Sequence, residues 1–311
     1  MRIVFMGTPD FAVESLKVLV EHDYHIVGVI TMPDKPAGRG HKIQFSPVKQ
    51  YALEHNLKLL QPTNLKDESF IADLKALQAD LQIVVAFRML PEVVWNMPPL
   101  GTFNLHASLL PQYRGAAPIN WAIINGEKET GNTTFFLTHD IDTGNIILQE
   151  KTPIYEDDDA GSLHDRLMIM GAQMVKNTVD TIAKGKFEAK KQTELIHDNT
   201  MLKPAPKLFR ENCEIDFTQS AQAVYDFVRG LSPYPVAWTD MQLPGQTQDI
   251  RLKVYRTEKE LSTHQQPIAS VHTDGKNFLK IAVKDGFIHL LEIQAPGKRR
   301  MDIGSFLRGL Q

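Results

Sequence analysis

The chain has 311 residues, of which 42% are hydrophobic and 23% are charged, and this composition excludes a disordered or fibrous protein. The length favours two domains over one. The 34 Lys+Arg and 37 Asp+Glu residues give a net charge of −3, which excludes an overall basic nucleic-acid coat protein but not a local basic face. The chain has one cysteine, Cys213, and therefore no internal disulfide.

These features predict a cytoplasmic protein. A reducing compartment suits a chain without disulfides. The first apolar run, residues 1–6, is too short for a signal peptide, and no apolar stretch approaches twenty residues, so we expect no contact with a membrane.

The first half of the chain alternates strand and helix patterns. Short apolar runs predict strands over residues 2–7, 25–31 and 81–87, and the periodic segments between them predict helices, including 46–55 and 68–78. A further helix is expected over 160–182. Runs that are apolar on both faces suit a buried parallel sheet, so the pattern predicts a doubly wound, Rossmann-like α/β domain with a mainly parallel sheet.

The second half has a different pattern. Lys203-Pro-Ala-Pro-Lys207 is a proline-rich connector, and beyond it a helix over 221–231 precedes alternating strands over 250–256, 277–283 and 287–293. We predict an α/β domain over 1–185, a connector over 186–207, and a C-terminal domain over 208–311 that forms a small closed β-barrel.

The turn Gly7-Thr-Pro-Asp-Phe-Ala12 stands where a dinucleotide-binding fold has its glycine-rich loop. It lacks the second and third glycines that let the pyrophosphate approach, so NAD binding is not expected here. The acidic run over 157–159 is interpreted as the start of a helix rather than a metal site.

The densest group of chemically active residues lies at the end of a strand predicted over 102–107. Period-two alternation places Asn104 and His106 on the same side of this strand. An asparagine can donate to a developing oxyanion and a histidine can move a proton, and these are two of the roles that acyl transfer needs. Asp140 and Asp142, in the loop after a strand predicted over 133–138, are candidates for an orienting carboxylate.

Taken alone, an Asn-x-His pair is more typical of a structural histidine than of an active site. Two polar loops at strand ends of one α/β sheet favour the functional reading, because ligands bind there. Ser108 lacks the G-x-S-x-G pattern of a nucleophile, Cys213 has no activating neighbours, and no spacing resembles a zinc site. We therefore predict direct transfer between two bound substrates, without a metal.

The chain resembles the methionyl-tRNA formyltransferase family from end to end. The motifs that carry the resemblance are Gly7-Thr-Pro-Asp-Phe-Ala12, Pro33-Asp-Lys-Pro-Ala-Gly-Arg39-Gly40, Ser46-Pro-Val-Lys49, Asn104-x-His106-x-Ser108-Leu-Leu-Pro111, Arg114-Gly-Ala-Ala-Pro118, Asp142-Thr-Gly144 and Pro296-Gly-Lys-Arg-Arg-Met301. The Asn-x-His and Asp-Thr-Gly elements occur throughout the folate-dependent formyltransferases, whereas the basic segment over 33–49 is typical of the members that act on tRNA.

The resemblance implies transfer of the formyl group of 10-formyltetrahydrofolate, a co-substrate, to the amino group of initiator methionyl-tRNA in translation initiation. It places Asn104, His106 and Asp142 in the catalytic centre, with Asp142 orienting His106 and raising its proton affinity. Ser108, Leu109, Leu110 and Pro111 are expected against the folate. It implies no metal and no obligate protein partner. The alternative is a sugar-nucleotide formyltransferase that uses the same three residues.

For tRNA the resemblance implies contacts from Arg39, Lys42 and Lys207, with charge added by Lys35 and Lys49. Each lysine could equally be an ordinary solvated surface residue. The C-terminal domain is expected to be OB-like, a fold that is often used on nucleic acids.

Two positions depart from the family pattern. Where the family has Ala-Tyr-Gly-x-x-x-Pro, in a loop expected to line the pterin pocket, this chain has Ala86-Phe-Arg-Met-Leu-Pro91, which is one residue shorter and lacks the glycine. The family's Asp-Thr-Gly-Asp is Asp142-Thr-Gly-Asn145 here, which removes a carboxylate. Neither departure alters the three predicted catalytic residues.

Overall fold

A computed structural model of the protein describes residues 1–37, 42–185, 187–196, 201–243 and 246–310. The chain forms two compact units. Unit 1 comprises Met1–Gly115, Thr130–Thr152 and His164–Pro204, and unit 2 comprises Ala116–Glu129, Pro153–Leu163 and Ala205–Gln311. Because the units interleave along the chain, no single cut separates them, and the domain boundaries at 185 and 207 stay a prediction.

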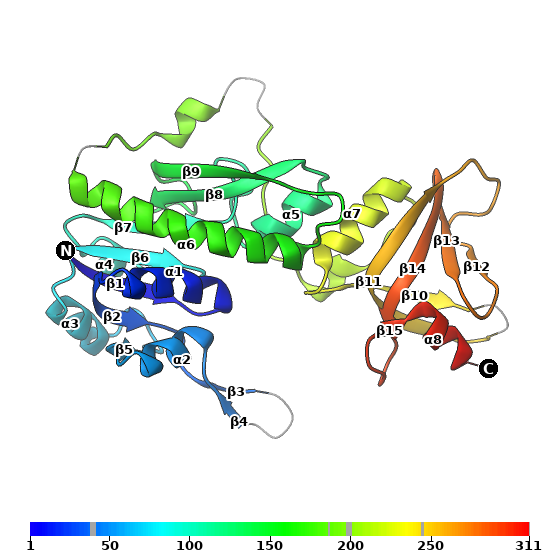
Figure 1. Ribbon diagram of the computed structural model, residues 1–311, viewed down its shortest axis with the longest axis horizontal. Coiled ribbons are helices and arrows are strands. Elements are labelled where there is room, and N and C mark those ends of the chain that lie inside the picture. Colours follow the sequence, from blue (N-terminus) through cyan, green and yellow to red (C-terminus); the bar gives the residue numbers. More distant parts are fainter. Residues whose placement is uncertain (38–41, 186, 197–200, 244–245, 311) are drawn as a thin grey trace. The chain divides into compact units, whose positions relative to one another are not determined.

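Unit 1 is built on a seven-stranded sheet with the order β5-β2-β1-β6-β7-β8-β9 (Figure 1). Its strands are β1 (Arg2–Gly7), β2 (His25–Ile30), β5 (Leu59–Leu60), β6 (Leu81–Val85), β7 (Thr102–His106), β8 (Glu129–Phe136) and β9 (Ile146–Pro153). Neighbours from β5 to β7 are parallel, and β8 is antiparallel to β7. The mainly parallel sheet predicted from the sequence is confirmed.

Helices cover both faces of this sheet, as its apolar strands require. They are α1 (Asp10–Glu21), α2 (Pro47–Glu54), α3 (Glu68–Ala76), α4 (Glu92–Trp95) and α6 (Ala160–Lys184). Side chains of α3 and α4 share one core with Val4, Met6 and Val84. On the other face α1 approaches β1 so closely that a Cβ on Gly7 would lie 2.5 Å from the Cβ of Ala12.

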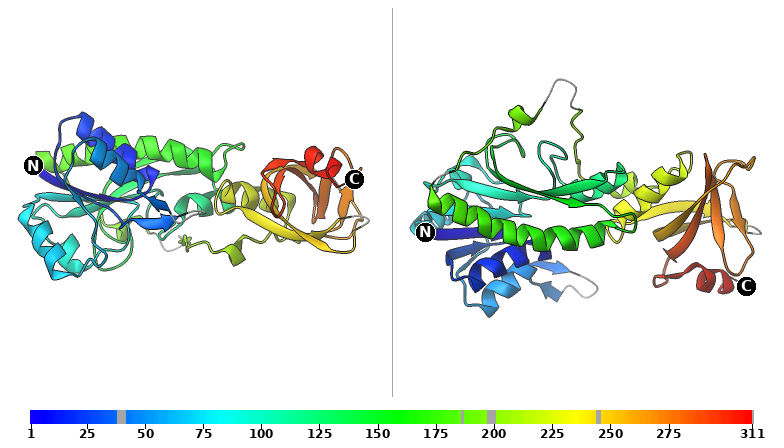
Figure 2. Two further views of the ribbon diagram at one scale, coloured as in Figure 1. Left: turned by 90° about the horizontal axis from the view of Figure 1, so that it is seen from below. Right: turned by 45° about the horizontal axis from the view of Figure 1, so that its top comes forward.

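Helix α6 runs along the sheet as its longest helix (Figures 1 and 2). The expected acidic helix start is seen here, because Asp159 Oδ1 accepts from the Ser162 amide at 2.8 Å. None of the described helices combines the length and hydrophobicity that a membrane span requires. Two short strands, β3 (Lys35–Ala37) and β4 (Lys42–Gln44), pair separately as an antiparallel hairpin.

Unit 2 holds an antiparallel sheet that curls around its core (Figure 1). The strands are β10 (Ala237–Gln242), β11 (Asp249–Leu261), β12 (Val271–Thr273), β13 (Leu279–Val283), β14 (Gly286–Gln294) and β15 (Met301–Asp302), in the order β10-β11-β14-β13-β12 with β15 beside β14. The helices are α5 (Pro118–Ile124), α7 (Ala221–Leu231) and α8 (Ile303–Arg308), with a 3₁₀ turn, η2 (Arg210–Cys213).

The core of unit 2 forms where the apolar face of α7 meets the sheet. Val224 and Val228 of α7 are buried with Leu252 of β11 and Ile293 of β14. Cys213 joins this core, and burial raises the pKa of its thiol, which agrees with the prediction that it is not an attacking group.

Candidate active site

Strand β7 presents Asn104 and His106 on one face of the unit 1 sheet. Leu105 points to the opposite face, where a Cβ added to Gly171 of α6 would lie 2.7 Å from its Cδ2. Asn104 is paired in register with Val84, which belongs to the core under α3 and α4. The Asn104 side chain is half-buried, and its carboxamide has no hydrogen-bond partner in the part of the chain that the structure describes, so both amide hydrogens are available to a ligand.

His106 lies next to Asp142 and not next to Asp140. Its Nδ1 is 3.9 Å from Asp142 Oδ2, and both side chains are mostly buried. On the other edge of the ring, Nε2 is 2.8 Å from the Tyr113 carbonyl, and the Gly115 amide donates to Asp142 Oδ2 at 2.9 Å. An Nε2 proton donated to that carbonyl leaves Nδ1 as the atom that can gain or lose a proton toward the carboxylate.

The backbone around this pair is constrained. Tyr113 and Asp142 both adopt left-handed conformations, with φ of 60° and 55°. Gly144 follows in a turn with no room for a side chain, because a Cβ there would lie 1.6 Å from the Phe136 carbonyl oxygen. Residues held in such conformations often cluster at functional sites. Asn145, at the family's second aspartate, is exposed, and its carbonyl accepts from the Phe136 amide at 3.0 Å.

The segment expected against the folate is mostly buried. Ser108, Leu110 and Pro111 are buried, and Leu109 is the one with a partly exposed side chain. The Ser108 hydroxyl donates to the Gln112 carbonyl at 2.7 Å, so it is already satisfied within the protein. Three of these residues are therefore packed inside the protein. Contact of the segment with folate stays a prediction.

The shortened loop over 86–91 borders an open groove of about 740 Å³, which residues 63–66 and 88–93 line. Arg88, without an assigned role in the sequence, anchors this loop by donating to the carbonyls of Thr63 and Pro62. Its burial lowers the pKa of the guanidinium. The loop lacks the family's glycine, and its first residue, Ala86, has a φ of 47°. The groove also lies beside the Asp142 loop, because His139 is 3.6 Å from Glu92.

The predicted tRNA contacts have different outcomes. Arg39 lies outside the described residues, and Lys42 is the first residue of β4, where it pairs with Ala37, the last residue of β3. Lys207 is exposed, with its Nζ 5.3 Å from the Phe209 ring centre. Their contact with tRNA stays a prediction.

Lys49 is not the ordinary solvated surface residue of the alternative interpretation, whereas its charge contribution to tRNA binding stays a prediction. Its side chain is mostly buried, and its Nζ lies 2.5 Å from Asp34 Oδ2 and 3.9 Å from the centre of the Phe45 ring. Hydrogen bonds from Lys49 and then from Gln61 lower the pKa of the Asp34 carboxyl. Lys49 therefore anchors the segments that flank the hairpin.

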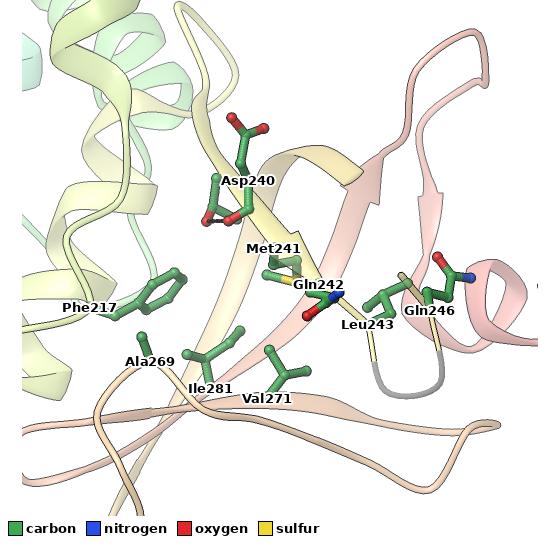
Figure 3. A pocket seen from close by; sticks show the side chains of 10 residues that line it. Phe217, Asp240, Met241, Gln242, Leu243, Gln246, Ala269, Val271 and Ile281 are labelled. Carbon is green, nitrogen blue, oxygen red and sulfur yellow. Dashed lines mark hydrogen bonds between the residues drawn. The ribbon is translucent and has the colours of Figure 1, made fainter. Parts of the chain in front are cut away.

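A second hollow lies in unit 2, between β10 and the strands β12 and β13 (Figure 3). It has a volume of about 440 Å³, and Phe217, Met241 and Ile281 face it, with Asp240 at its rim. Among the lining residues that the structure describes, Asp240 is the titratable one, and Arg251 already binds its carboxylate. The chemistry that the residues support is therefore in unit 1.

Two contacts that shape the site could not be predicted from the sequence. The Tyr113 carbonyl holds His106, and the side chain of Gln192, in the 3₁₀ turn η1 (Gln192–Leu195), donates to the carbonyl of Asp142 at 2.8 Å. Both act through backbone groups, which any residue type carries. No motif or spacing marks them.

Comparison with known proteins identifies the family. A model described as "Formyl transferase" matches residues 1–179, and one described as "Formyl transferase, C-terminal domain" matches residues 207–311. The chain belongs to the formyl transferase family. This formyltransferase is 60% identical to the methionyl-tRNA formyltransferase of Parabacteroides distasonis over 312 residues, which cover 100% of this chain and 96% of the relative. It is 54% identical to that of Flavobacterium johnsoniae, with the same coverage. The resemblance seen in the motifs is confirmed.

Solved structures share the fold of this formyltransferase at lower identity. An N-formyltransferase from Helicobacter canadensis, in complex with folinic acid and dTDP-3-aminofucose, is 20% identical with a TM-score of 0.66, covering 94% of this chain and 98% of that one. HypX from Aquifex aeolicus, in complex with tetrahydrofolic acid, is 18% identical with a TM-score of 0.62, covering 100% of this chain and 47% of that one. These likenesses concern the fold alone.

Proposed function

We propose that this formyltransferase transfers the formyl group of 10-formyltetrahydrofolate to the α-amino group of methionine on initiator methionyl-tRNA. One observation carries the proposal: Asn104 and His106 share one face of β7, with Asp142 Oδ2 3.9 Å from His106 Nδ1, in a chain that is 60% identical to a methionyl-tRNA formyltransferase over its whole length. The sugar formyltransferases among the solved structures, which represent the alternative, match at 16–23% identity.

In the proposed mechanism the amine attacks the formyl carbon, and the carbonyl oxygen becomes an oxyanion. Collapse of this oxyanion breaks the bond between the formyl carbon and N10 of the folate. The amine loses a proton, N10 takes one up, and tetrahydrofolate leaves. The free carboxamide of Asn104 donates to that oxygen. Removal of one such donor typically costs about 10²–10³ in rate, so this contact is expected to be a large part of catalysis. The two substrates must also be held in line, which supplies a further share of the rate enhancement.

His106 supplies the proton-transfer group in this mechanism. Its Nε2 keeps one proton in the hydrogen bond to the Tyr113 carbonyl. The second ring proton, which makes the imidazole an imidazolium, is therefore held at Nδ1, on the side of Asp142. An imidazolium at this place stabilises the oxyanion, and the Asp142 carboxylate stabilises the imidazolium and fixes the ring. Asp142 is in turn held by the Gly115 amide.

We propose that the folate lies against Leu109 and the loop over 86–91, because that loop opens into the groove of about 740 Å³ beside the Asp142 loop. In the same proposal residues 1–185 are the catalytic domain, residues 186–207 the connector, and residues 208–311 an OB-like domain that binds tRNA together with Arg39, Lys42 and Lys207. The exposed position of Lys207 supports its part in this. We propose a cytoplasmic site of action, with no metal and no obligate protein partner.

The deciding experiment incubates the purified chain with 10-formyltetrahydrofolate and charged initiator tRNA and measures formyl-methionine. We expect formylation of methionyl-tRNA and no product from a nucleotide-linked amino sugar. Formylation of the sugar nucleotide without formylation of tRNA would favour the alternative, and no product from either would overturn the proposal.

Replacement of Arg39 by alanine is expected to raise the KM for tRNA and to make its salt dependence shallower, because one phosphate contact is lost. The KM for folate should stay unchanged. Steady-state kinetics at several salt concentrations measure both. Lys75→Ala, which removes a charge from α3, is the control for a general change of charge. Unaltered tRNA kinetics in Arg39→Ala would remove this arginine from tRNA binding.

A further inference from the structure

The side chain of Gln192 is buried within unit 1, with 2% of the residue exposed, and all of its polar groups are used. Its Nε2 donates to the carbonyls of Asp142 and Gly144 at 2.8 and 2.9 Å. Its Oε1 accepts from Nε and Nη2 of Arg114 at 3.1 and 2.6 Å. One carboxamide thus joins two separate segments of the chain.

The first segment is the turn that carries the Asp142 carboxylate. Asp142 has a φ of 55°, a conformation that persists in a non-glycine residue only when its surroundings enforce it. Gln192 binds a carbonyl on each side of this turn, at residues 142 and 144. The two donors therefore hold the strained turn in the conformation that directs the carboxylate toward His106.

The second segment is the loop that contacts His106 and Asp142 from the other side. Arg114 stands between Tyr113, whose carbonyl is 2.8 Å from His106 Nε2, and Gly115, whose amide is 2.9 Å from Asp142 Oδ2. A guanidinium held by Gln192 restrains both neighbouring peptide groups. Both supports of the His106–Asp142 pair are thus tied to one side chain.

The chain around Gln192 is itself docked on unit 1. Lys190 exchanges two backbone hydrogen bonds with Ile146, each of 2.8 Å. Farther on, the Lys203 carbonyl accepts from the Tyr113 amide at 2.7 Å, and the Lys203 amide donates to the side chain of Gln112 at 2.8 Å. Gln192 is therefore anchored by its own segment, which makes it a rigid support for the turn.

We infer that Gln192 is a positioning residue for formyl transfer, which sets the place of Asp142 relative to His106 without touching a substrate. This rests on the proposed function. A merely structural role would lower the stability of the fold and leave turnover per folded molecule unchanged. A positioning role lowers kcat, because misplacement of a catalytic group by about 1 Å can cost about 100-fold in rate.

The experiment uses the full chain with 10-formyltetrahydrofolate and charged initiator tRNA. We expect Gln192→Ala to lower kcat by about 10- to 100-fold with little change in the KM of either substrate. Gln192→Glu keeps an acceptor for Arg114 but replaces the donor to the turn, so a similar loss is expected. Arg114→Lys leaves both donors to the turn in place and should lose less. Gln82→Ala, a buried glutamine at the opposite end of the parallel strands, is the control for lost stability and should keep its kcat.

A double-variant cycle separates positioning from an independent effect. In an Asp142→Ala background, Gln192→Ala should cause a clearly smaller loss than in the wild-type chain. The part of its effect that passes through Asp142 is then already gone, and only its support of the Tyr113 loop remains. Additive losses, an unchanged kcat in Gln192→Ala, or a larger loss in Arg114→Lys than in Gln192→Ala would each overturn the inference. An inactive wild-type chain would instead overturn the proposed function, and the inference with it.

Discussion

Replacement of His106 by alanine is expected to lower kcat for formyl transfer by about 10²–10⁴-fold, because the group that holds a proton beside the oxyanion is lost. The carboxylate of Asp142 then faces a cavity with no imidazole between it and the Tyr113 carbonyl. Asn104→Ala is expected to cost about 10²–10³-fold through loss of the oxyanion donor. Single-turnover formylation of methionyl-tRNA measures both losses, and tRNA affinity should be kept.

Leu105→Val is the matched control for these two variants. It lies between them on the same strand but packs on the α6 face, so it should lower stability by about 1 kcal/mol and leave turnover unchanged. Turnover in His106→Ala or Asn104→Ala that stays within a few-fold of the wild type would remove that residue from the mechanism. A chain that binds tRNA but has no turnover to lose would be a binding module instead.

Much of the fold could be predicted because buried strands are continuously apolar. Strands β1, β2 and β6 have this pattern and were predicted with small changes of boundary. Strand β8 was predicted to begin at residue 133, yet it begins at Glu129. Its buried Asn132 resembles a loop residue in sequence, but its side-chain amide donates to the Leu167 carbonyl of α6.

Strands with weak patterns were missed. Strand β5 has two residues, and β9 is apolar only at its start, because it is an edge strand whose far half is exposed. Strand β10 alternates as a strand should, but the polar Thr239 lies on its buried side and hides the pattern. These elements depend on contacts with the rest of the fold and not on local sequence.

The candidate site likewise contains residues that a sequence pattern predicts and contacts that no pattern predicts. The side chains of Asn104 and His106 follow from strand alternation, and the Asp-Thr-Gly turn places Asp142 at a strand end, so a pattern points to each. The supports from Tyr113 and Gln192 engage backbone carbonyls, and Lys49 is paired by Asp34, which lies 15 positions away. Long-range pairing of this kind has no sequence period.

A buried ion pair in unit 2 is expected to contribute strongly to the stability of the fold. Arg229 and Asp226, on α7, have side chains that are 8% and 5% exposed. Arg229 Nη2 lies 2.7 Å from Asp226 Oδ1. The guanidinium also donates to the carbonyls of Tyr155 and Asp158, at 3.1 and 2.8 Å. It therefore ties α7 to the segment that leads into α6, and its charge balances the buried Asp226 carboxylate.

Replacement of Arg229 by methionine is expected to lower the free energy of unfolding by about 3–5 kcal/mol, because the Asp226 charge is left buried without its partner. Arg251→Met breaks an exposed Arg–Asp pair with Asp240, whose side chains are 41% and 38% exposed, and should cost far less, because solvent screens the pair. Denaturant unfolding of the two variants compares them directly. The double variant Asp226→Leu with Arg229→Met removes the orphaned charge and should recover part of the loss. Equal losses of stability in Arg229→Met and Arg251→Met would mean that burial does not determine how much an ion pair contributes. A double variant no more stable than Arg229→Met would mean that the loss comes from the hydrogen bonds to the two backbone carbonyls.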